Sequence, residues 1–208
     1  RTSWWTGSVT EMIYTSFVDI PDNSYDLLMG DNPWLYTGSK TRFQAAGKHY
    51  KCMSVADQLA AFDYRRIMPK RSIALVWATG PKMHHAIQFI EGSGLHYRGI
   101  ALVWVKTAAD GHIINGQGGP PTTVKSTTEF LLVGSHKKTG RPLPIHDHGM
   151  AQVLLAPRGK EHSEKPAEAF YRMERLFGDV RRLELFARAE RGGWDAFGNE
   201  VGKLEARP

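Results

Sequence analysis

The sequence of 208 residues contains one cysteine, Cys52, and no long hydrophobic run. A lone thiol excludes an internal disulfide framework and a zinc site built from cysteines. No apolar stretch reaches the roughly 20 residues that a membrane-spanning helix requires. A G-x-G-x-x-G turn between a strand and a helix is also missing, because the glycines at 116–119 fall in a long loop. The sequence therefore argues against a disulfide scaffold, a membrane protein and a phosphate-cradling nucleotide fold.

Basic residues are plentiful, giving a formal charge of +6 and an isoelectric point near 9.5. An excess of positive charge favours an anionic partner, and nucleic acid is the commonest of these. The length suits one domain with a full core, so we expect a single domain over residues 1–208. The single cysteine fits a reducing compartment, and we expect a cytoplasmic protein.

Strands and helices alternate along the chain. Short apolar runs bounded by turn residues predict strands at 24–31, 72–79, 99–106, 129–136, 150–157 and 181–188. Apolar residues at helical spacing predict helices at 53–68, with Ser54 as N-cap, at 82–94 and at 165–178. Alternation of this kind predicts an α/β fold with a mostly parallel, twisted sheet flanked by helices.

Two stretches interrupt the alternation, at residues 36–53 and 106–127. Both are polar, both carry lysines, and both follow predicted strand ends. Long loops in a compact domain are usually functional, and ligands of open α/β sheets collect beyond the carboxyl ends of strands. We therefore interpret them as functional loops, with variable surface loops as the alternative.

The segment Asp31-Asn32-Pro33-Trp34 ends the first buried strand abruptly. Pro33 has a fixed φ and restricts Asn32 to an extended conformation, which makes the corner stiff. The Asp31 carboxylate and the Asn32 carbonyl are then two fixed acceptors, and Trp34 is a flat surface beside them. This combination suits a heteroaromatic ring that bears an exocyclic amine. An Asx-type turn with a core tryptophan is the alternative that these four residues leave open.

The segment "DNPW" resembles the Asp-Pro-Pro-Trp signature of the MT-A70 family of adenine N6-methyltransferases. Further segments resemble the family in the same order. They are "HYKCMS" (49–54), "LVWATGPKMHHAIQFIEGSGLHYRGIALVWVK" (75–106), "HSEKPAEAFYRMERLFG" (162–178) and "RRLELFARAERGGWDAFGNE" (181–200). The resemblance extends over about residues 18–202, nearly the whole chain.

This resemblance implies a Rossmann-like methyltransferase fold with S-adenosylmethionine as methyl donor. Asp31 would lie near the amino group of the donor, and Lys165 would face its carboxylate. The ribose hydroxyls would be held by Arg188, Asn199 and Glu200. The backbone of Ile20 would meet the adenine of the donor.

For the substrate, the resemblance implies that Asp31, Asn32, Pro33 and Trp34 form the catalytic corner. Trp34 and Tyr50 would stack the target base. Phosphates would be contacted by basic residues of the two long loops, because basic loops with interleaved aromatic residues suit phosphate contact and stacking. These residues are Lys40, Arg42, Lys48 and Lys125. The reaction requires no metal.

One position departs from the signature, because Asn32 stands where the family usually has proline. The backbone carbonyl is retained, but the rigidity that a proline ring would add at position 32 is lost. The sequence favours DNA as substrate, in a bacterial cell or a phage-infected host. RNA methylation, methylation of a small aromatic amine and a non-catalytic nucleic-acid-binding partner subunit remain alternatives. Because family members often pair, a homodimer is a further expectation.

Overall fold

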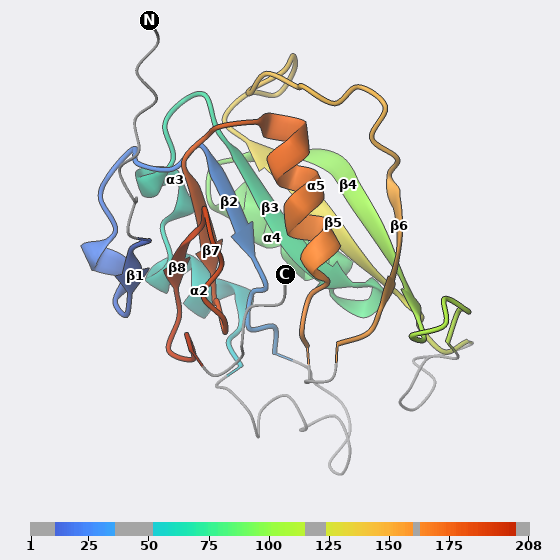
Figure 1. Ribbon diagram of the computed structural model, residues 1–208. Helices are drawn as coiled ribbons and strands as arrows, with labels where there is room; N and C mark the ends of the chain where they lie inside the picture. Colours follow the sequence, from blue (N-terminus) through green and yellow to red (C-terminus); the bar gives the residue numbers. More distant parts are fainter. Residues whose placement is uncertain (1–10, 36–51, 115–123, 160–162, 203–208) are drawn as a thin grey trace, which may run out of the picture.

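The computed structural model describes residues 11–35, 52–114, 124–159 and 163–202. Eight strands of these residues form one sheet in the order β1-β8-β7-β2-β3-β5-β4-β6 (Figure 1). Their bounds are Ile13–Tyr14, Leu27–Gly30, Ile73–Thr79, His96–Thr107, Thr128–Ser135, Val153–Pro157, Arg182–Leu185 and Asp195–Phe197, for β1 to β8. Of the helices in the described ranges, none combines the length and the apolar character that a membrane crossing demands.

The sheet is mixed, with parallel pairs in the majority. Within the described residues five strand pairs are parallel, while β5 runs antiparallel to both of its neighbours, β3 and β4. The predicted α/β class and the six predicted strands are confirmed, with shifted ends. Strands β1 and β8 were not predicted, because two or three residues are too few to show the alternation of apolar and polar side chains that marks a strand.

The helices are α2 (Val55–Ala61), α3 (Tyr64–Ile67), α4 (Met83–Gly92) and α5 (Ala167–Phe177), with short 3-10 turns at Phe17–Asp19 and Gly80–Lys82. Ser54 caps α2 as predicted, by accepting a bond from the Asp57 amide at 3.1 Å. The prediction of a single helix over 53–68 is wrong, because the structure has two helices there. The helical run breaks at Phe62, and the Asp63 carboxylate caps the new helix by accepting from the Arg66 amide at 3.1 Å.

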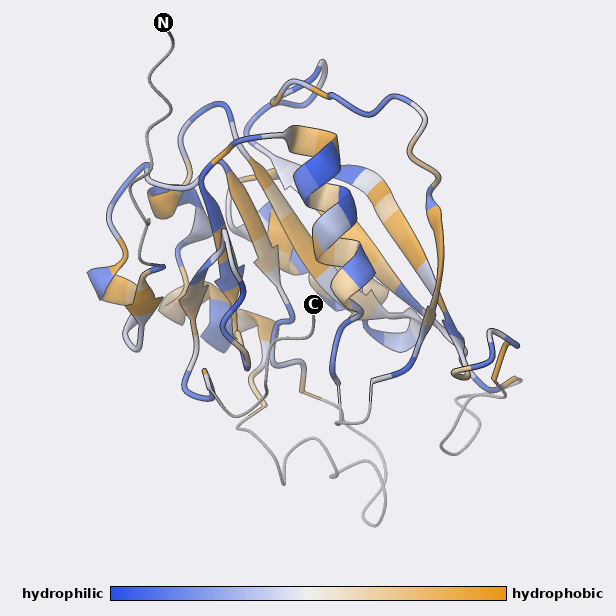
Figure 2. Cartoon of the chain, viewed as in Figure 1, coloured by the Kyte–Doolittle hydropathy of each residue, from blue (hydrophilic) through white to orange (hydrophobic). Residues whose placement is uncertain are grey.

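Side chains of the central strands alternate between two cores. Ala74, Val76 and Ala78 of β3 pack on the side of α3 and α4, whereas Leu75 and Trp77 pack on the side of α5. Helix α5 crosses one face of the sheet and α4 lies behind the other. Figure 2 shows the central strands as hydrophobic and α5 as two-sided. A sheet buried on both faces leaves its edges and strand ends for function.

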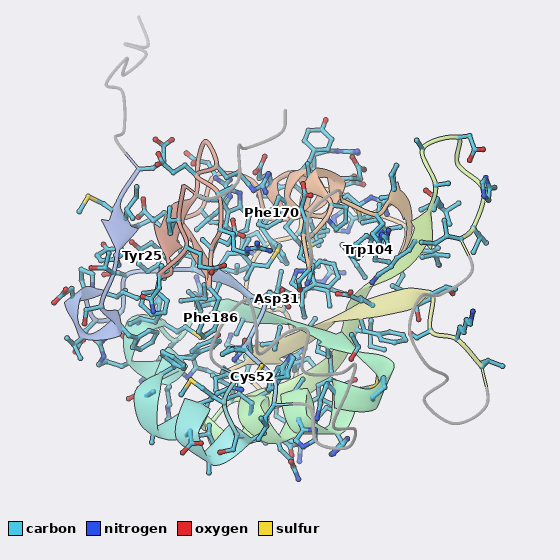
Figure 3. The ribbon with its side chains drawn as sticks, turned by 90° about the horizontal axis from the view of Figure 1, so that it is seen from below. Tyr25, Asp31, Cys52, Trp104, Phe170 and Phe186 are labelled. Carbon is cyan, nitrogen blue, oxygen red and sulfur yellow. The ribbon has the colours of Figure 1, made fainter. Side chains whose placement is uncertain are left out.

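The carboxyl ends of β2, β3 and β7 meet at one edge of the sheet, because these strands are parallel neighbours. The antiparallel β5 begins at the same edge, so its first residues, including Glu129, lie beside the ends of the others. Asp31 directly follows β2 and Phe186 directly follows β7. Figure 3 looks at the protein from this side and shows Asp31 near its centre.

Candidate active site

The corner that follows β2 is stiffened by hydrogen bonds as well as by proline. The Trp34 amide donates to the Asn32 carbonyl at 2.9 Å, which closes a tight turn around Pro33. The chain returns to this point at Met53. Its amide donates to the Pro33 carbonyl at 2.8 Å, and its carbonyl accepts from the Leu35 amide at 3.1 Å. The corner is therefore paired with the segment that follows residues 36–51.

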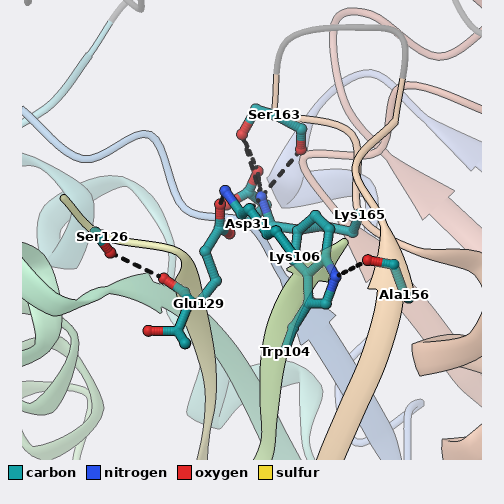
Figure 4. A network of polar contacts seen from close by, with 9 residues as sticks. Asp31, Trp104, Lys106, Ser126, Glu129, Ala156, Ser163 and Lys165 are labelled. Carbon is teal, nitrogen blue, oxygen red and sulfur yellow. Dashed lines mark hydrogen bonds and ion pairs between the residues drawn. The ribbon is translucent and has the colours of Figure 1, made fainter. Parts of the chain in front are cut away.

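Asp31 is held by two side chains from the segment that leads into α5. The Lys165 ammonium donates to Asp31 Oδ2 at 2.6 Å, and the Ser163 hydroxyl donates to the same oxygen at 2.9 Å (Figure 4). None of the described residues donates to Oδ1, and the side chain remains 30% exposed. One carboxylate oxygen is thus committed to the protein, and the other is available to a ligand.

Lys165 also connects Asp31 to a second, more deeply buried carboxylate. Its ammonium lies 3.3 Å from Glu129 Oε2, and Lys106 donates to Glu129 Oε1 at 2.6 Å. Burial by itself would raise the pKa of Glu129, but Lys165 and Lys106 together lower it below its ordinary value. The carboxylate therefore remains ionised.

Glu129 is not predicted as a site residue, because an isolated glutamate at the start of an apolar strand carries no motif. The ion pair of Lys106 with Glu129 places this lysine inside the site, over the ring of Trp104 at 4.9 Å. Residues 106 and 107 also belong to β4, so the predicted loop begins later than expected.

A cavity of about 460 Å³ lies on one side of Asp31, beyond the ends of β2, β7 and β8. Aromatic side chains supply much of its wall, among them Phe17, Phe62, Phe186 and Phe197. Arg188, Asn199 and Glu200 line it as well, and Arg188 Nε lies 3.1 Å from Glu200 Oε2. The cavity thus joins an apolar wall to a polar rim, which suits a nucleoside.

A second cavity, of about 300 Å³, shares Asp31, Ser163, Phe186 and Arg188 with the first. Charged side chains distinguish it, chiefly Lys165, Glu184 and Arg191. Burial raises the pKa of Glu184 to about 7, and the negative charge of Asp31 adds to the shift while Arg191 opposes it. This cavity suits a ligand that carries both an ammonium and a carboxylate.

A small recess of about 30 Å³ lies beside the corner, lined by Asp31, Asn32, Trp34, Glu129 and Lys165 among others. Trp34 contributes only an edge to it, because the side chain is 5% exposed. Its indole N–H donates to the Trp77 carbonyl at 3.0 Å, and its ring packs against Phe89. Trp34 is a core residue here, and base stacking by its ring remains a prediction.

The backbone of Ile20, which the resemblance places against the adenine of the donor, does not line the aromatic cavity, and its role stays a prediction. The residue is fully buried. Its amide donates to the Phe17 carbonyl at 3.3 Å, and its own carbonyl accepts from Arg66 at 2.7 Å. The cavity is lined instead by residues 15–18, immediately before it in the chain.

The other predicted site residues fall into three groups. The structure gathers Asp31, Lys165, Arg188, Asn199 and Glu200 around the two larger cavities. Lys40, Arg42, Lys48 and Tyr50 lie outside the described residues. Lys125 is exposed in the segment before β5. The roles of these residues toward donor and substrate stay predictions.

A model of the MT-A70 family matches residues 25–200, which contain the corner, Lys165 with its carboxylate partners, and strands β2 to β8. The chain belongs to the MT-A70 family. As a family member it is a methyltransferase of the Rossmann-like α/β class, and this class implies S-adenosylmethionine as the general methyl donor.

Among curated relatives, the MT-A70 chain is 29% identical over 202 residues to the "Type II methyltransferase M.MunI" of Mycoplasma sp. The match spans 89% of this chain and 81% of that one. It is 26% identical to the human "N(6)-adenine-specific methyltransferase METTL4", over 88% of this chain but 38% of the relative. A rice protein, "Probable N(6)-adenosine-methyltransferase MT-A70-like", is 31% identical over 62% of this chain and 18% of its own length.

Proposed function

We propose that this chain transfers a methyl group from S-adenosylmethionine to the N6 amine of adenine in DNA. The observation that carries the proposal is the position of Asp31, whose carboxylate lies where the aromatic cavity, the charged cavity and the small recess meet. A methyl donor and an amine must approach each other at one point, and this is the point that all three spaces share.

The two larger cavities suit the two halves of the donor. The aromatic wall at Phe17, Phe62 and Phe197 offers surface for an adenine ring, and the polar rim at Asn199 and Glu200 offers partners for ribose hydroxyls. The charged cavity offers Lys165 for a carboxylate, and Glu184 and Asp31 for an ammonium group. The shared wall between them is where the sulfonium would lie.

The donor supplies an electrophilic methyl group on a positively charged sulfur. Asp31 Oδ1 and the Asn32 carbonyl, which already accepts from the Trp34 amide at 2.9 Å and has a second lone pair, would accept the two N–H bonds of the amine. These bonds would localise the nitrogen lone pair, which is otherwise delocalised into the ring. They would also stabilise the positive charge that develops on nitrogen. Alignment by the fixed corner contributes up to about 7–11 kcal/mol in ideal cases.

One proton must leave the nitrogen as the nitrogen–carbon bond forms and the carbon–sulfur bond breaks. Asp31 is the acidic member of the corner, and its charge is balanced by Lys165 at 2.6 Å. We assign to Asp31 Oδ1 the role of holding that proton on its way to solvent. The ion-paired side chains of Lys165, Glu129 and Lys106 would keep the site polar during the transfer.

DNA as substrate, rather than RNA, is supported by the name of the Mycoplasma relative, a type II methyltransferase. The target adenine must leave the duplex or come from a single strand to reach the corner. Trp34 and Tyr50 would stack the base, and Lys40, Arg42, Lys48 and Lys125 would contact phosphates. We also propose action inside a bacterial or phage-infected cell, and a homodimer as the working state.

The test is a side-by-side methylation assay on single-stranded DNA, duplex DNA and RNA oligonucleotides, with N6-methyladenine identified by mass spectrometry. We expect methylation of DNA in preference to RNA, and donor binding that is measurable by calorimetry. Methylation of RNA alone would contradict the proposed substrate. Absence of donor binding would contradict the enzymatic function and favour a non-catalytic partner subunit.

A further inference from the structure

The Asn32 side chain is enclosed by two hydrogen-bond partners, Gln58 and Tyr64, that no sequence motif predicts. Its Nδ2 donates to Gln58 Oε1 at 2.9 Å, and its Oδ1 accepts from the Tyr64 hydroxyl at 3.0 Å. Asn32 is 2% exposed, Gln58 0% and Tyr64 1%. A fully buried polar trio is costly unless its members satisfy one another, so these contacts hold the amide in one orientation.

Gln58 also reaches the chain that returns to the corner. Its Nε2 donates to the Met53 carbonyl at 3.2 Å and lies 3.5 Å from the Pro33 carbonyl. Gln58 stands on α2, whose start is fixed by the Ser54 cap. The Gln58 carboxamide therefore links the corner at Asn32 and Pro33 to Met53, which follows residues 36–51 in the chain.

Tyr64 is rigid for separate reasons. Its ring packs edge-on against Phe89 with centroids 4.8 Å apart, and burial raises the pKa of its phenol, which stays protonated and donates. The space around its hydroxyl is tight, because a Cβ at Gly30 would lie 2.7 Å from the Tyr64 oxygen and 2.9 Å from Asn32 Oδ1. The hydroxyl and the amide oxygen therefore lie directly against Gly30, where a larger residue would displace them.

We infer that Gln58 and Tyr64 are positioning residues for methyl transfer, which act through Asn32. This inference rests on the proposed function. The direction of the Asn32 carbonyl is set by the φ and ψ of Asn32, and Pro33 restricts that conformation only in part. A proline at 32 would fix φ directly. In this chain the buried clamp of Gln58 and Tyr64 holds the Asn32 side chain, and together with the Trp34 amide, which donates to the Asn32 carbonyl at 2.9 Å, it would keep that carbonyl in the direction needed for the amine.

The test combines Gln58→Met, Tyr64→Phe and Asn32→Pro with the double variants Asn32→Pro/Gln58→Met and Asn32→Pro/Tyr64→Phe. We expect Gln58→Met and Tyr64→Phe each to lower the single-turnover methylation rate about tenfold or more, since small displacements of reacting groups are costly. Donor affinity, measured by calorimetry, should change less than about threefold, because neither Gln58 nor Tyr64 lines the two cavities proposed for the donor. In the Asn32→Pro background the same two changes should lower the rate less than about threefold.

The matched control is Tyr25→Phe. Tyr25 is fully buried in the same core, and its hydroxyl donates to Asp195 at 2.6 Å, away from the corner. It should lose thermal stability as Tyr64→Phe does while its saturating rate stays unchanged. Clamp variants that lose stability but keep the wild-type rate, or lose rate equally with and without Asn32→Pro, would overturn the inference alone. A wild-type chain that binds no donor and methylates nothing would overturn the proposed function and this inference with it.

Discussion

Lys165 and Asp31 lie 134 positions apart in the sequence, and their side chains form an ion pair of 2.6 Å at the carboxyl edge of the sheet. The lysine is 7% exposed and touches a second carboxylate, Glu129, at 3.3 Å. One ammonium thus balances two acids that would otherwise repel each other in a partly dry site. The ion pairs therefore bring charges from distant parts of the chain together at one point of the site.

Removal of this ammonium should therefore affect both binding and stability. We expect Lys165→Met to lower the free energy of unfolding by about 2–4 kcal/mol, because it leaves a buried carboxylate short of a partner. Donor affinity should also fall. Urea denaturation and calorimetry measure the two effects, with Lys165→Arg as the charge-retaining variant and Lys138→Met as the exposed control. Unchanged stability in Lys165→Met would contradict the role of the lysine as a buried counter-ion.

Asp31→Asn tests the corner itself with almost no change in shape. The amide keeps one acceptor but loses the negative charge that faces the developing positive charge on nitrogen. We expect the single-turnover methylation rate to fall by about 10²–10³-fold, the usual loss for one electrostatic contact in a transition state. Asp147→Asn, at an exposed ion pair with Arg175, is the control. A rate within tenfold of wild type would show that Asp31 does not act on the amine.

The sequence predicted much of this site because motifs report residues at strand and helix ends. Asp31, Lys165 and Arg188 each follow or precede a regular element, and their neighbours carry a recognisable pattern. The parts it missed depend on side chains meeting in space. Tyr64 contacts Asn32 from a separate short helix, because the predicted helix breaks at Phe62, and Glu129 lies beside Asp31 because β5 runs antiparallel. Register and direction of that kind follow from packing, and local propensity does not encode them.

Glu184 should make stability depend on pH. Its pKa rises from an ordinary 4.5 to about 7 in the folded chain, so the folded state binds the proton more tightly than the unfolded state. The free energy of unfolding then falls as the pH rises from about 4.5 to 7, by at most about 3 kcal/mol, and levels off above. The pKa of Glu129 is lowered, so its contribution is lost at more acidic pH and does not overlap with this range.

Denaturation of wild type and Glu184→Gln between pH 4.5 and 8 measures this dependence. The variant should be more stable than wild type at pH 8, and the difference should shrink or reverse toward pH 4.5. The exposed Glu190→Gln serves as the control. Parallel curves for wild type and Glu184→Gln would contradict the raised pKa.

Trp34→Phe distinguishes a structural from a stacking role for the indole. The change removes the N–H that the Trp77 carbonyl accepts at 3.0 Å in a buried setting, so we expect a loss of about 1–3 kcal/mol in unfolding free energy. Trp194→Phe is matched, because that indole is also buried and donates to Glu174 at 2.6 Å. If Trp34 also stacks the base, KM for the oligonucleotide will rise for Trp34→Phe and not for Trp194→Phe.

Gly30→Ala tests how tightly the end of β2 is packed against the corner. A methyl group there would lie 2.7 Å from the Tyr64 hydroxyl and 2.9 Å from Asn32 Oδ1, closer than real Cβ contacts come. Because both atoms belong to one buried hydrogen bond, the methyl group must push them apart and weaken that bond. We expect a loss of about 1–3 kcal/mol in stability and about a tenfold loss in single-turnover rate. Gly192→Ala, where a Cβ meets open space, should change neither. Wild-type kinetics in Gly30→Ala would mean that the corner tolerates displacement of Asn32, which its buried contacts argue against.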